Sequence, residues 1–117
     1  LVKRGDRDAA LHECVAALEI RNDYFEAWMT LGNLHAADGA WDKAFGAFGE
    51  AVERTKNPFQ ALVSRAGAAA ALGKRAEALS DLDRAQKAAE GSSDKLAELH
   101  RRRALVLEKL REVDKDR

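Results

Sequence analysis

The residues of this chain that could perform chemistry are few, and they lie far apart. Its three histidines, His12, His35 and His100, form neither a HExxH motif nor a Cys/His spacing suited to a metal ion. The single cysteine, Cys14, excludes an internal disulfide and favours a reducing compartment. No glycine-rich phosphate loop follows a strand pattern. The sequence therefore predicts no catalytic residue, no metal site and no cofactor, and we do not expect an enzyme.

One local cluster of charge, the run HRRR at 100–103, raises the alternative of nucleic-acid binding. The run has no aromatic neighbour, and Glu98 and Glu108 flank it. The whole chain has 20 Lys and Arg against 20 Asp and Glu, so no net charge attracts it to nucleic acid or to an acidic membrane. We interpret the run as a solvated or partner-facing patch on a helix.

The elements that carry these residues are predicted to be helices. The 117 residues are enough for one domain with a core, and the only proline is Pro58. No segment alternates as a strand would, and none approaches the roughly 20 apolar residues of a membrane-spanning helix. The composition predicts an all-α protein that has no membrane partner.

A repeat of 34 residues organises the chain. Glycine recurs at this step at positions 5, 39 and 73, and alanine recurs at 10, 44 and 78 and again at 17, 51 and 85. Another column holds Cys14, Phe48 and Leu82. Each unit therefore has one helical stripe of large and small residues, and a second helix must approach closely at the alanines.

Each unit divides into two helices that a glycine turn connects. We expect helices over residues 26–38 and 42–55, with Gly39 in a left-handed turn between them. Gly73 marks the equivalent turn of the next unit, and a helix over residues 74–90 follows it.

Local sequence predicts further details. Asn57 and Pro58 are suited to the cap and the first position of the next helix. The glycines in FGAFGE, residues 45–50, are expected at packing positions within a helix. Asp81 and Arg84 are expected to form an ordinary solvated pair on a helix surface.

The segment AWMTLGNLHAADGAWDKAFGAFGEAV, residues 27–52, resembles the tetratricopeptide repeat family. It has the family's Trp, Leu-Gly, Gly, Ala, Phe and Ala in order, with His35 in place of Tyr and Pro58 two residues beyond the usual proline. The resemblance implies a right-handed α-solenoid of antiparallel helix pairs. His35 is then expected to pack between helices, and Cys14 to be a buried core thiol.

The repeats divide the chain into four segments of one tetratricopeptide array. Residues 1–24 are expected to be the second helix of a truncated repeat, 25–58 and 59–92 two full repeats, and 93–117 a partial one. Because the chain begins with Leu rather than Met, we interpret it as a fragment of a longer protein.

The last segment departs from the regular step. Aligning Ala104 with Ala66 gives a spacing of 38 rather than 34, which predicts a loop lengthened by four residues around 90–93. We expect a helix over 93–110, a turn at Arg111, and the start of a second helix in 112–117. Apolar side chains are expected to be exposed at the two cut ends, where copies could self-associate: Leu11, Val15, Leu18, Leu107 and Val113.

In tetratricopeptide solenoids the first helices of successive repeats line a concave groove. The resemblance therefore implies a non-catalytic scaffold that binds a protein partner, as a peptide or a helix, in this groove. Arginine and asparagine suit such a role because they hold peptide backbone and carboxylates through directed hydrogen bonds. The positions expected in the groove are Met29, Asn33, Val63, Ser64, Gly67, Arg101, Arg102, Leu105 and Lys109.

Two alternative functions remain open. One subfamily of chaperone adaptors grips an acidic C-terminal peptide with a five-residue clamp; Asn33 and Arg102 agree with it, but Met29, Ser64 and Glu98 replace a lysine, an asparagine and a lysine. An adaptor with this incomplete clamp is the first alternative. The second is a structural segment that packs on the rest of its own chain. The resemblance fits the cytoplasm, with the nucleus as the alternative compartment.

If Gly39 takes a left-handed turn, the substitution Gly39→Val forces a β-branched residue into a strained backbone. We expect the free energy of unfolding to fall by about 1 kcal/mol or more. Thermal unfolding followed by circular dichroism measures the change, and an unaltered melting temperature would show that the turn is assigned wrongly.

Overall fold

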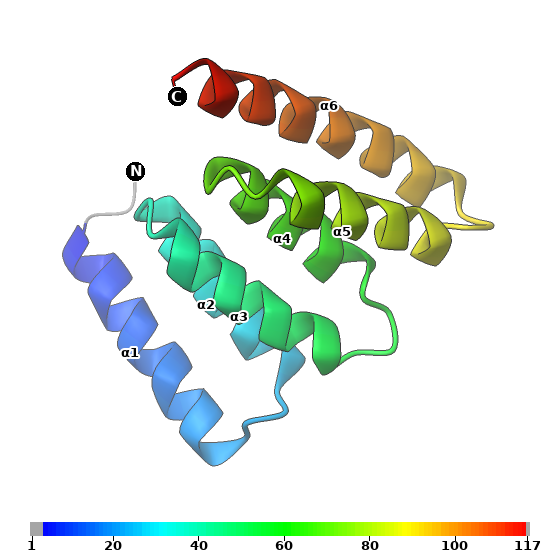
Figure 1. Cartoon of the computed structure of the whole chain (residues 1–117). Coiled ribbons are helices and arrows are strands. Elements are labelled where there is room, and N and C mark those ends of the chain that lie inside the picture. Colours follow the sequence, from blue (N-terminus) through cyan, green and yellow to red (C-terminus); the bar gives the residue numbers. More distant parts are fainter. Residues whose placement is uncertain (1–3, 117) are drawn as a thin grey trace.

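The computed structural model describes residues 4–116. Within this range the chain forms α-helices and no strand, which confirms the all-α prediction. Residues 1–3 of the predicted first segment, and Arg117 at the end of the last, lie outside the described range. Figure 1 labels the six helices, which are α1 Arg4–Ile20, α2 Phe25–Ala37, α3 Trp41–Glu53, α4 Phe59–Ala71, α5 Arg75–Ala88 and α6 Ser93–Lys115.

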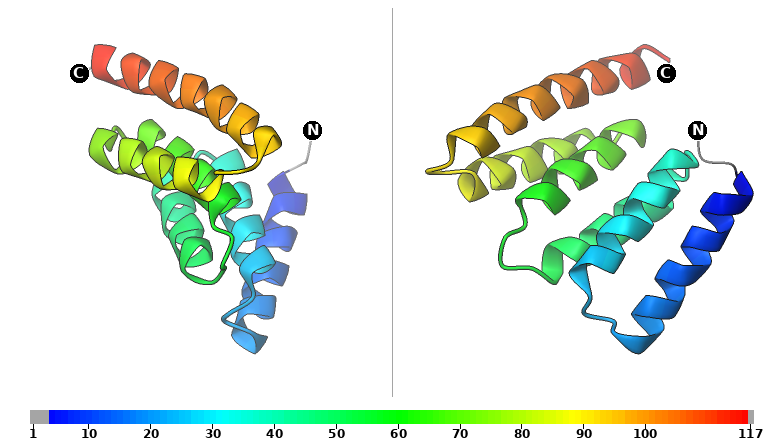
Figure 2. Two further views of the ribbon diagram at one scale, coloured as in Figure 1. Left: turned by 90° about the vertical axis from the view of Figure 1, so that its right-hand side faces the viewer. Right: turned by 180° about the vertical axis from the view of Figure 1, so that it is seen from behind.

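Four of the helices form two layers. In Figure 1, α3 and α5 lie in front of α2 and α4, and the reverse view in Figure 2 brings α2 and α4 to the front. Each helix packs against the next one in the chain, and α4 also packs against α6. The central helix α4 therefore has three neighbours, α3, α5 and α6.

The helices recur with the step found in the sequence. α2, α4 and α6 begin at Phe25, Phe59 and Ser93, and α3 and α5 begin at Trp41 and Arg75, so equivalent starts are 34 residues apart. Because α6 begins in this register, the predicted lengthening of the loop before it is wrong.

The turns after α2 and α4 have the predicted geometry. Gly39 has φ +74° and Gly73 has φ +73°, the left-handed region that glycine adopts without strain. The N–H of Gly39 donates to the carbonyl of Ala36 at 3.0 Å, and the N–H of Ala40 donates to that of His35 at 2.9 Å. Equivalent bonds surround Gly73. The two turns thus close their helix ends in the same way.

α2 and α3 approach each other closely at small residues, as the stripe predicted. Ala44 and Ala51 are fully buried, and Phe48 is 3% exposed. A Cβ atom added to Gly32 would lie 2.4 Å from Cε1 of Phe48, so the ring occupies the space that any side chain at position 32 needs.

α4 is the most enclosed helix. Its large side chains Phe59, Leu62 and Val63 are at most 2% exposed. Because its remaining buried side chains are single methyl groups, neighbouring helices can approach its backbone closely. These residues are Ala61, Ala66, Ala68, Ala69 and Ala70.

A partly buried ion pair connects α4 and α5. Arg65 donates from Nε to Oδ2 of Asp81 at 2.9 Å and from Nη2 to Oδ1 at 2.8 Å, and the two side chains are 18% and 5% exposed. The predicted solvated pair of Asp81 with Arg84 is therefore wrong. Asp81 follows Ala78 by three positions and precedes Ala85 by four, so the helical period places it on their buried face.

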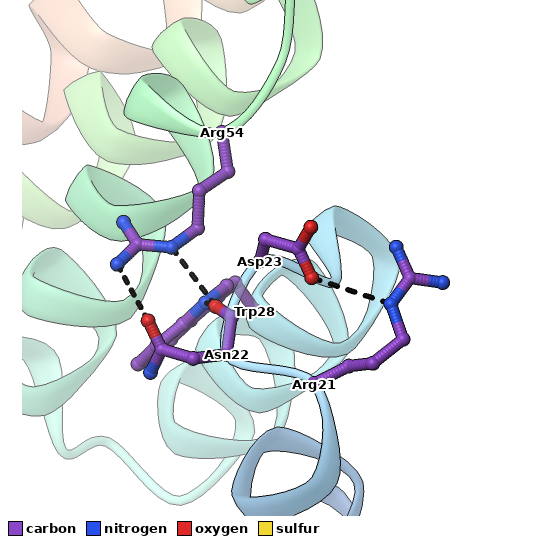
Figure 3. A network of polar contacts seen from close by, with 5 residues as sticks. All are labelled: Arg21, Asn22, Asp23, Trp28 and Arg54. Carbon is purple, nitrogen blue, oxygen red and sulfur yellow. Dashed lines mark hydrogen bonds and ion pairs between the residues drawn. The ribbon is translucent and has the colours of Figure 1, made fainter.

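A polar network fixes the entry to α2 against the end of α3 (Figure 3). Arg54 donates from Nε to the carbonyl of Asn22 and from Nη2 to its Oδ1, both at 2.9 Å. The indole N–H of Trp28 donates to the same carbonyl at 2.7 Å, and the guanidinium of Arg54 lies 5.3 Å from the centroid of the Trp28 ring. Arg21 pairs instead with Asp23 at 3.2 Å.

The start of α4 differs from the prediction by one residue. The helix begins at Phe59, and Pro58 is its N-cap residue, whose carbonyl accepts the N–H of Leu62 at 2.8 Å. Asn57 does not cap the helix; its own N–H donates to Oγ1 of Thr55 at 3.1 Å. Proline has no backbone N–H, so Pro58 contributes only its carbonyl acceptor and adds no unpaired donor at the start of the helix.

α6 continues without a turn from Ser93–Lys115, so the predicted turn at Arg111 and the second helix in 112–117 are wrong. An arginine lacks the access of glycine to a left-handed backbone. Arg111 instead pairs with Glu108, one turn earlier in the same helix, at 2.9 Å. The N-terminus of α6 is capped, since Oγ of Ser92 accepts the N–H of Lys95 at 3.2 Å.

Two packing predictions are corrected. Cys14 is only half-buried because α1 packs mainly on α2, and burial and then the charge of Glu13 raise the pKa of the thiol. Gly46 is exposed, and a Cβ added there meets nothing within 4 Å, whereas one added to Gly49 lies 3.3 Å from Nη1 of Arg65.

His35 is half-buried on α2, and burial and then the charge of Lys43 lower the pKa of its imidazole. Among the apolar residues near the chain ends, Val15 and Leu107 are each 46% exposed, as predicted. Leu18 is buried, contrary to the prediction, and the remaining two, Leu11 and Val113, are half-buried.

The substitution Gly32→Ala tests the close approach of α2 and α3. We expect it to lower the free energy of unfolding by about 1–3 kcal/mol, because the new methyl group overlaps the confined ring of Phe48. The control is Gly46→Ala, which has open space and should gain about 0.5–1 kcal/mol from helix propensity. Urea unfolding measures both variants, and equal effects would contradict the close approach of α2 and α3 at Gly32.

The substitution Asp81→Asn leaves Arg65 with a partly buried charge and no carboxylate. We expect a loss of about 3 kcal/mol in the free energy of unfolding. Asp83→Asn, on the exposed side of the same helix, should stay within about 0.5 kcal/mol of the wild type. A similar stability of the two variants would mean that the ion pair contributes no more than a surface contact.

Candidate binding site between α2, α4 and α6

Two cavities adjoin along α4. One, of about 360 Å³, lies between α4 and α6, and the other, of about 210 Å³, lies between α2 and α4. Trp41, Gly67 and Arg102 line both, so we call the two cavities together the α4 groove. The larger is also lined by Ala70, Ala71, Leu105, Val106 and Lys109, and the smaller by Asn33, Ala36, Phe48, Ser64 and Ala68.

Six of the nine residues predicted for a groove line these cavities, and three do not. Val63 is fully buried in the core, and Met29 is half-buried against it, so neither faces the groove. Arg101 has a 61% exposed side chain that pairs with Glu98 at 2.7 Å. The six that line the groove are Asn33, Ser64, Gly67, Arg102, Leu105 and Lys109.

The floor of the groove follows from the small residues of α4. Ser64, Gly67 and Ala71 are three and four positions apart, so they form one stripe along the helix. A Cβ atom added to Gly67 meets nothing within 4 Å. The space above Gly67 is therefore open, and a partner could approach the backbone of α4 there.

Trp41 is a lining residue that was not among the positions predicted for the groove. In the structure it is half-buried and lines both cavities. The signal was present in the repeat, because the same column holds Arg7 and Arg75, and arginine is rarely a core residue.

Arg102 is a partly buried cation with a weak counter-charge. Its side chain is 28% exposed, and its Nη1 lies 3.7 Å from Oε1 of Glu98, beyond hydrogen-bond distance. Arg101 holds the same carboxylate more closely, at 2.7 Å and 3.2 Å, and this hydrogen bonding lowers the pKa of Glu98. Burial lowers the pKa of Arg102, and the charge of Glu98 opposes that effect. A carboxylate from a partner would therefore find this guanidinium incompletely neutralised.

A second cation lies farther along α6. Nζ of Lys109 is 3.8 Å from a carboxylate oxygen of Glu112, and both side chains are about half exposed, so this pair is weak. Leu105 lies between Arg102 and Lys109 on the helix and is 58% exposed. The groove thus combines an apolar floor with two cations at its rim, which suits a ligand with both apolar and carboxylate groups.

The described residues contain no group of three side chains from His, Cys, Asp and Glu that could hold a metal ion together. Of the helices in residues 4–116, none combines the length and apolar character needed to cross a membrane.

Comparison with models of protein families and with curated protein sequences found no match for the chain.

Proposed function

We propose that this chain is a non-catalytic interaction module, a segment of an α-solenoid built from tetratricopeptide-like helix pairs. The step of 34 residues between equivalent helix starts supports this proposal. So do the matching turns at Gly39 and Gly73 and the close contact of Phe48 with Gly32. In this arrangement α2, α4 and α6 are the first helices of successive units.

The observation that carries the proposed function is the α4 groove. It connects α2, α4 and α6 through cavities that share Trp41, Gly67 and Arg102. A peptide or a helix of a protein partner lies along α4 and places its side chains in the two cavities. Association then depends on buried apolar contacts and on charge at the rim, and no bond is made or broken.

A chaperone adaptor is the second candidate, and one observation favours it. Asn33, Ser64 and Arg102 line the smaller cavity together, so three clamp positions from three helices meet. Binding of an acidic C-terminal peptide that ends when its carboxylate is amidated would support this candidate. Met29 packs against the core and supplies no charge, so the affinity of such a clamp is low.

A structural segment of a longer solenoid is the third candidate. Ile20, Val15 and Leu107 are 85%, 46% and 46% exposed and lie on the outermost helices α1 and α6. Contacts of these side chains with other parts of the parent protein would cover them. In that case the α4 groove needs no ligand.

The substitution Gly67→Gln tests the interaction module. A Cβ atom at position 67 meets nothing within 4 Å, so the new side chain extends into the space that both cavities share. We expect peptides selected from a random displayed library on the wild-type chain to bind Gly67→Gln at least about tenfold more weakly, a loss of roughly 1.4 kcal/mol. Fluorescence polarisation with labelled peptides measures the affinity.

The matched control is Gly46→Gln, which changes another helical glycine with open space but lines neither cavity. Both substitutions should raise the free energy of unfolding by about 0.5 kcal/mol, because glutamine is the better helix former. Peptides that bind Gly67→Gln as tightly as the wild type, or a selection that yields no peptide, would overturn the module and leave the structural segment.

A further inference from the structure

One position near the start of α1, α3 and α5, which recurs every 34 residues, is used in two different ways. On α1, Arg7 forms an ion pair with Asp38 at the end of α2, and on α5, Arg75 forms one with Asp114 near the end of α6. The equivalent position on α3 is Trp41, 34 residues from each of these arginines. Ion pairs thus connect neighbouring helices at two of these three places, and a tryptophan stands at the third.

The end of α4 lacks the matching carboxylate. The residue 31 positions after Trp41 is Leu72, whereas the residue 31 positions after Arg7 is Asp38. No ion pair can therefore bridge α3 and the end of α4 in the same way. The indole lines the larger cavity there, together with Ala70 and Ala71. A half-buried tryptophan beside small residues is typical of the anchors that carry binding energy at protein interfaces.

The charged rim of the larger cavity indicates the chemistry of the occupant. Arg102 and Lys109 are seven residues apart on α6, which separates their backbones by about 10 Å along one side of the helix. Leu105 lies between them. The carboxylates of Glu98 and Glu112 are 3.7 Å from Arg102 and 3.8 Å from Lys109, so each cation can bind a further carboxylate. An apolar cavity with cations at both sides complements an apolar side chain that has acidic neighbours.

We propose that the larger cavity binds an internal acidic segment of a partner protein, with an aliphatic side chain against Trp41 and an adjacent side-chain carboxylate between Arg102 and Lys109. This inference rests on the proposed function, since it names the class of peptide that the α4 groove binds. The two cations are spread along α6 and do not converge on one point. Side-chain carboxylates along an extended segment match that spacing better than a single terminal carboxylate does.

Titration of the isotopically labelled chain with defined peptides tests the proposal. The probe is the hexapeptide Gly-Ser-Leu-Asp-Ser-Gly, acetylated and amidated so that it has no terminal charge. The chain contains two tryptophans, so the indole N–H signal of Trp28, which does not line the groove, is an internal reference for that of Trp41. We expect the Trp41 signal to shift with a saturable dependence on peptide and the Trp28 signal to stay in place.

Three changes to the peptide separate the two contacts. Replacing its Asp by Asn or by Lys should weaken binding at least about fivefold, because the carboxylate contact with Arg102 and Lys109 is lost. Replacing its Leu by Ala should weaken binding by a similar factor, because the apolar contact with Trp41 is lost. Equal binding of the Asp and Lys peptides, or no shift of the Trp41 signal at 10 mM peptide (about the weakest binding worth calling specific), would overturn the proposal.

Matched substitutions in the chain provide the second arm. Arg102→Gln and Lys109→Gln should each weaken binding of the Asp peptide several-fold. The controls Lys95→Gln and Lys115→Gln remove charge from the same helix outside both cavities and should leave the affinity unchanged. An equal loss with the controls would mean that the net charge of α6 attracts the peptide, and the specific contact would be wrong.

The double variant Trp41→Arg, Leu72→Asp installs the ion pair that α1 makes with α2, at the same spacing of 31 residues. We expect its circular dichroism to match the wild type and its binding of the Asp peptide to be lost. Retained binding by the folded variant would overturn the role of Trp41. If the variant does not fold, the Arg102 and Lys109 substitutions decide the proposal.

The outcomes separate this inference from the proposed function. Display peptides that depend on Gly67 but are basic, or that leave the Trp41 signal unchanged, would keep the interaction module and overturn the acidic segment. A selection that yields no Gly67-dependent peptide overturns the module itself. Shifts of the Trp41 signal that require a free terminal carboxylate would support the chaperone-adaptor alternative and contradict the internal segment.

Discussion

The packing of α4 against three neighbours is the constraint on which the rest of the structure depends. Its buried surface consists of a few large side chains and a series of methyl groups, and α3, α5 and α6 lie close to its backbone for that reason. A larger residue at the fully buried Ala66 or Ala69 would force these neighbours away from α4. Two polar side chains of α4 have different surroundings. Arg65 forms an ion pair with Asp81, and Ser64 lines the smaller cavity. The helix packing of the fold therefore depends mainly on the central helix α4 and less on the terminal helices.

The same small residues create the candidate site. Where a neighbouring helix covers α4, its methyl groups form a tight interface. Around Gly67, the helices α2, α3 and α6 do not cover α4 completely, and two cavities remain. The groove is thus a consequence of one stripe of small residues on α4, Ser64, Gly67 and Ala71. What the site adds to this geometry comes from other elements: an indole from α3 and two cations from α6. The chemistry can accordingly vary without any change in the helix that provides the floor.

Much of the fold was predictable from the sequence because it depends on local rules. The turn at Gly39 needs only a residue that tolerates positive φ, and the buried face of α3 at Ala44 and Ala51 follows from the helical period. The predictions failed where the outcome depends on which neighbour is present. Asp81 was paired with the nearest arginine along its own helix, but its true partner is on α4. The continuation of α6 past Arg111 was missed because a repeat was extended beyond the residues that support it. In the candidate site, Arg102 and Gly67 were expected from the resemblance, whereas Trp41 comes from the other layer, where only the comparison with Arg7 and Arg75 would have identified it.

The buried ion pair also has a consequence for the folding of a chain whose halves resemble each other. The positions equivalent to Arg65 and Asp81 in the preceding unit are Leu31 and Ala47, which are apolar. If α4 formed its hairpin contact with α3 in place of α5, Arg65 would face Ala47 and lose its carboxylate, and Asp81 would have no cation. Such an exchange costs several kcal/mol, because each charge would have to be desolvated alone. The pair therefore makes helix pairing specific. It distinguishes α5 from α3 as the partner of α4 and disfavours the misassembly to which repetitive chains are prone.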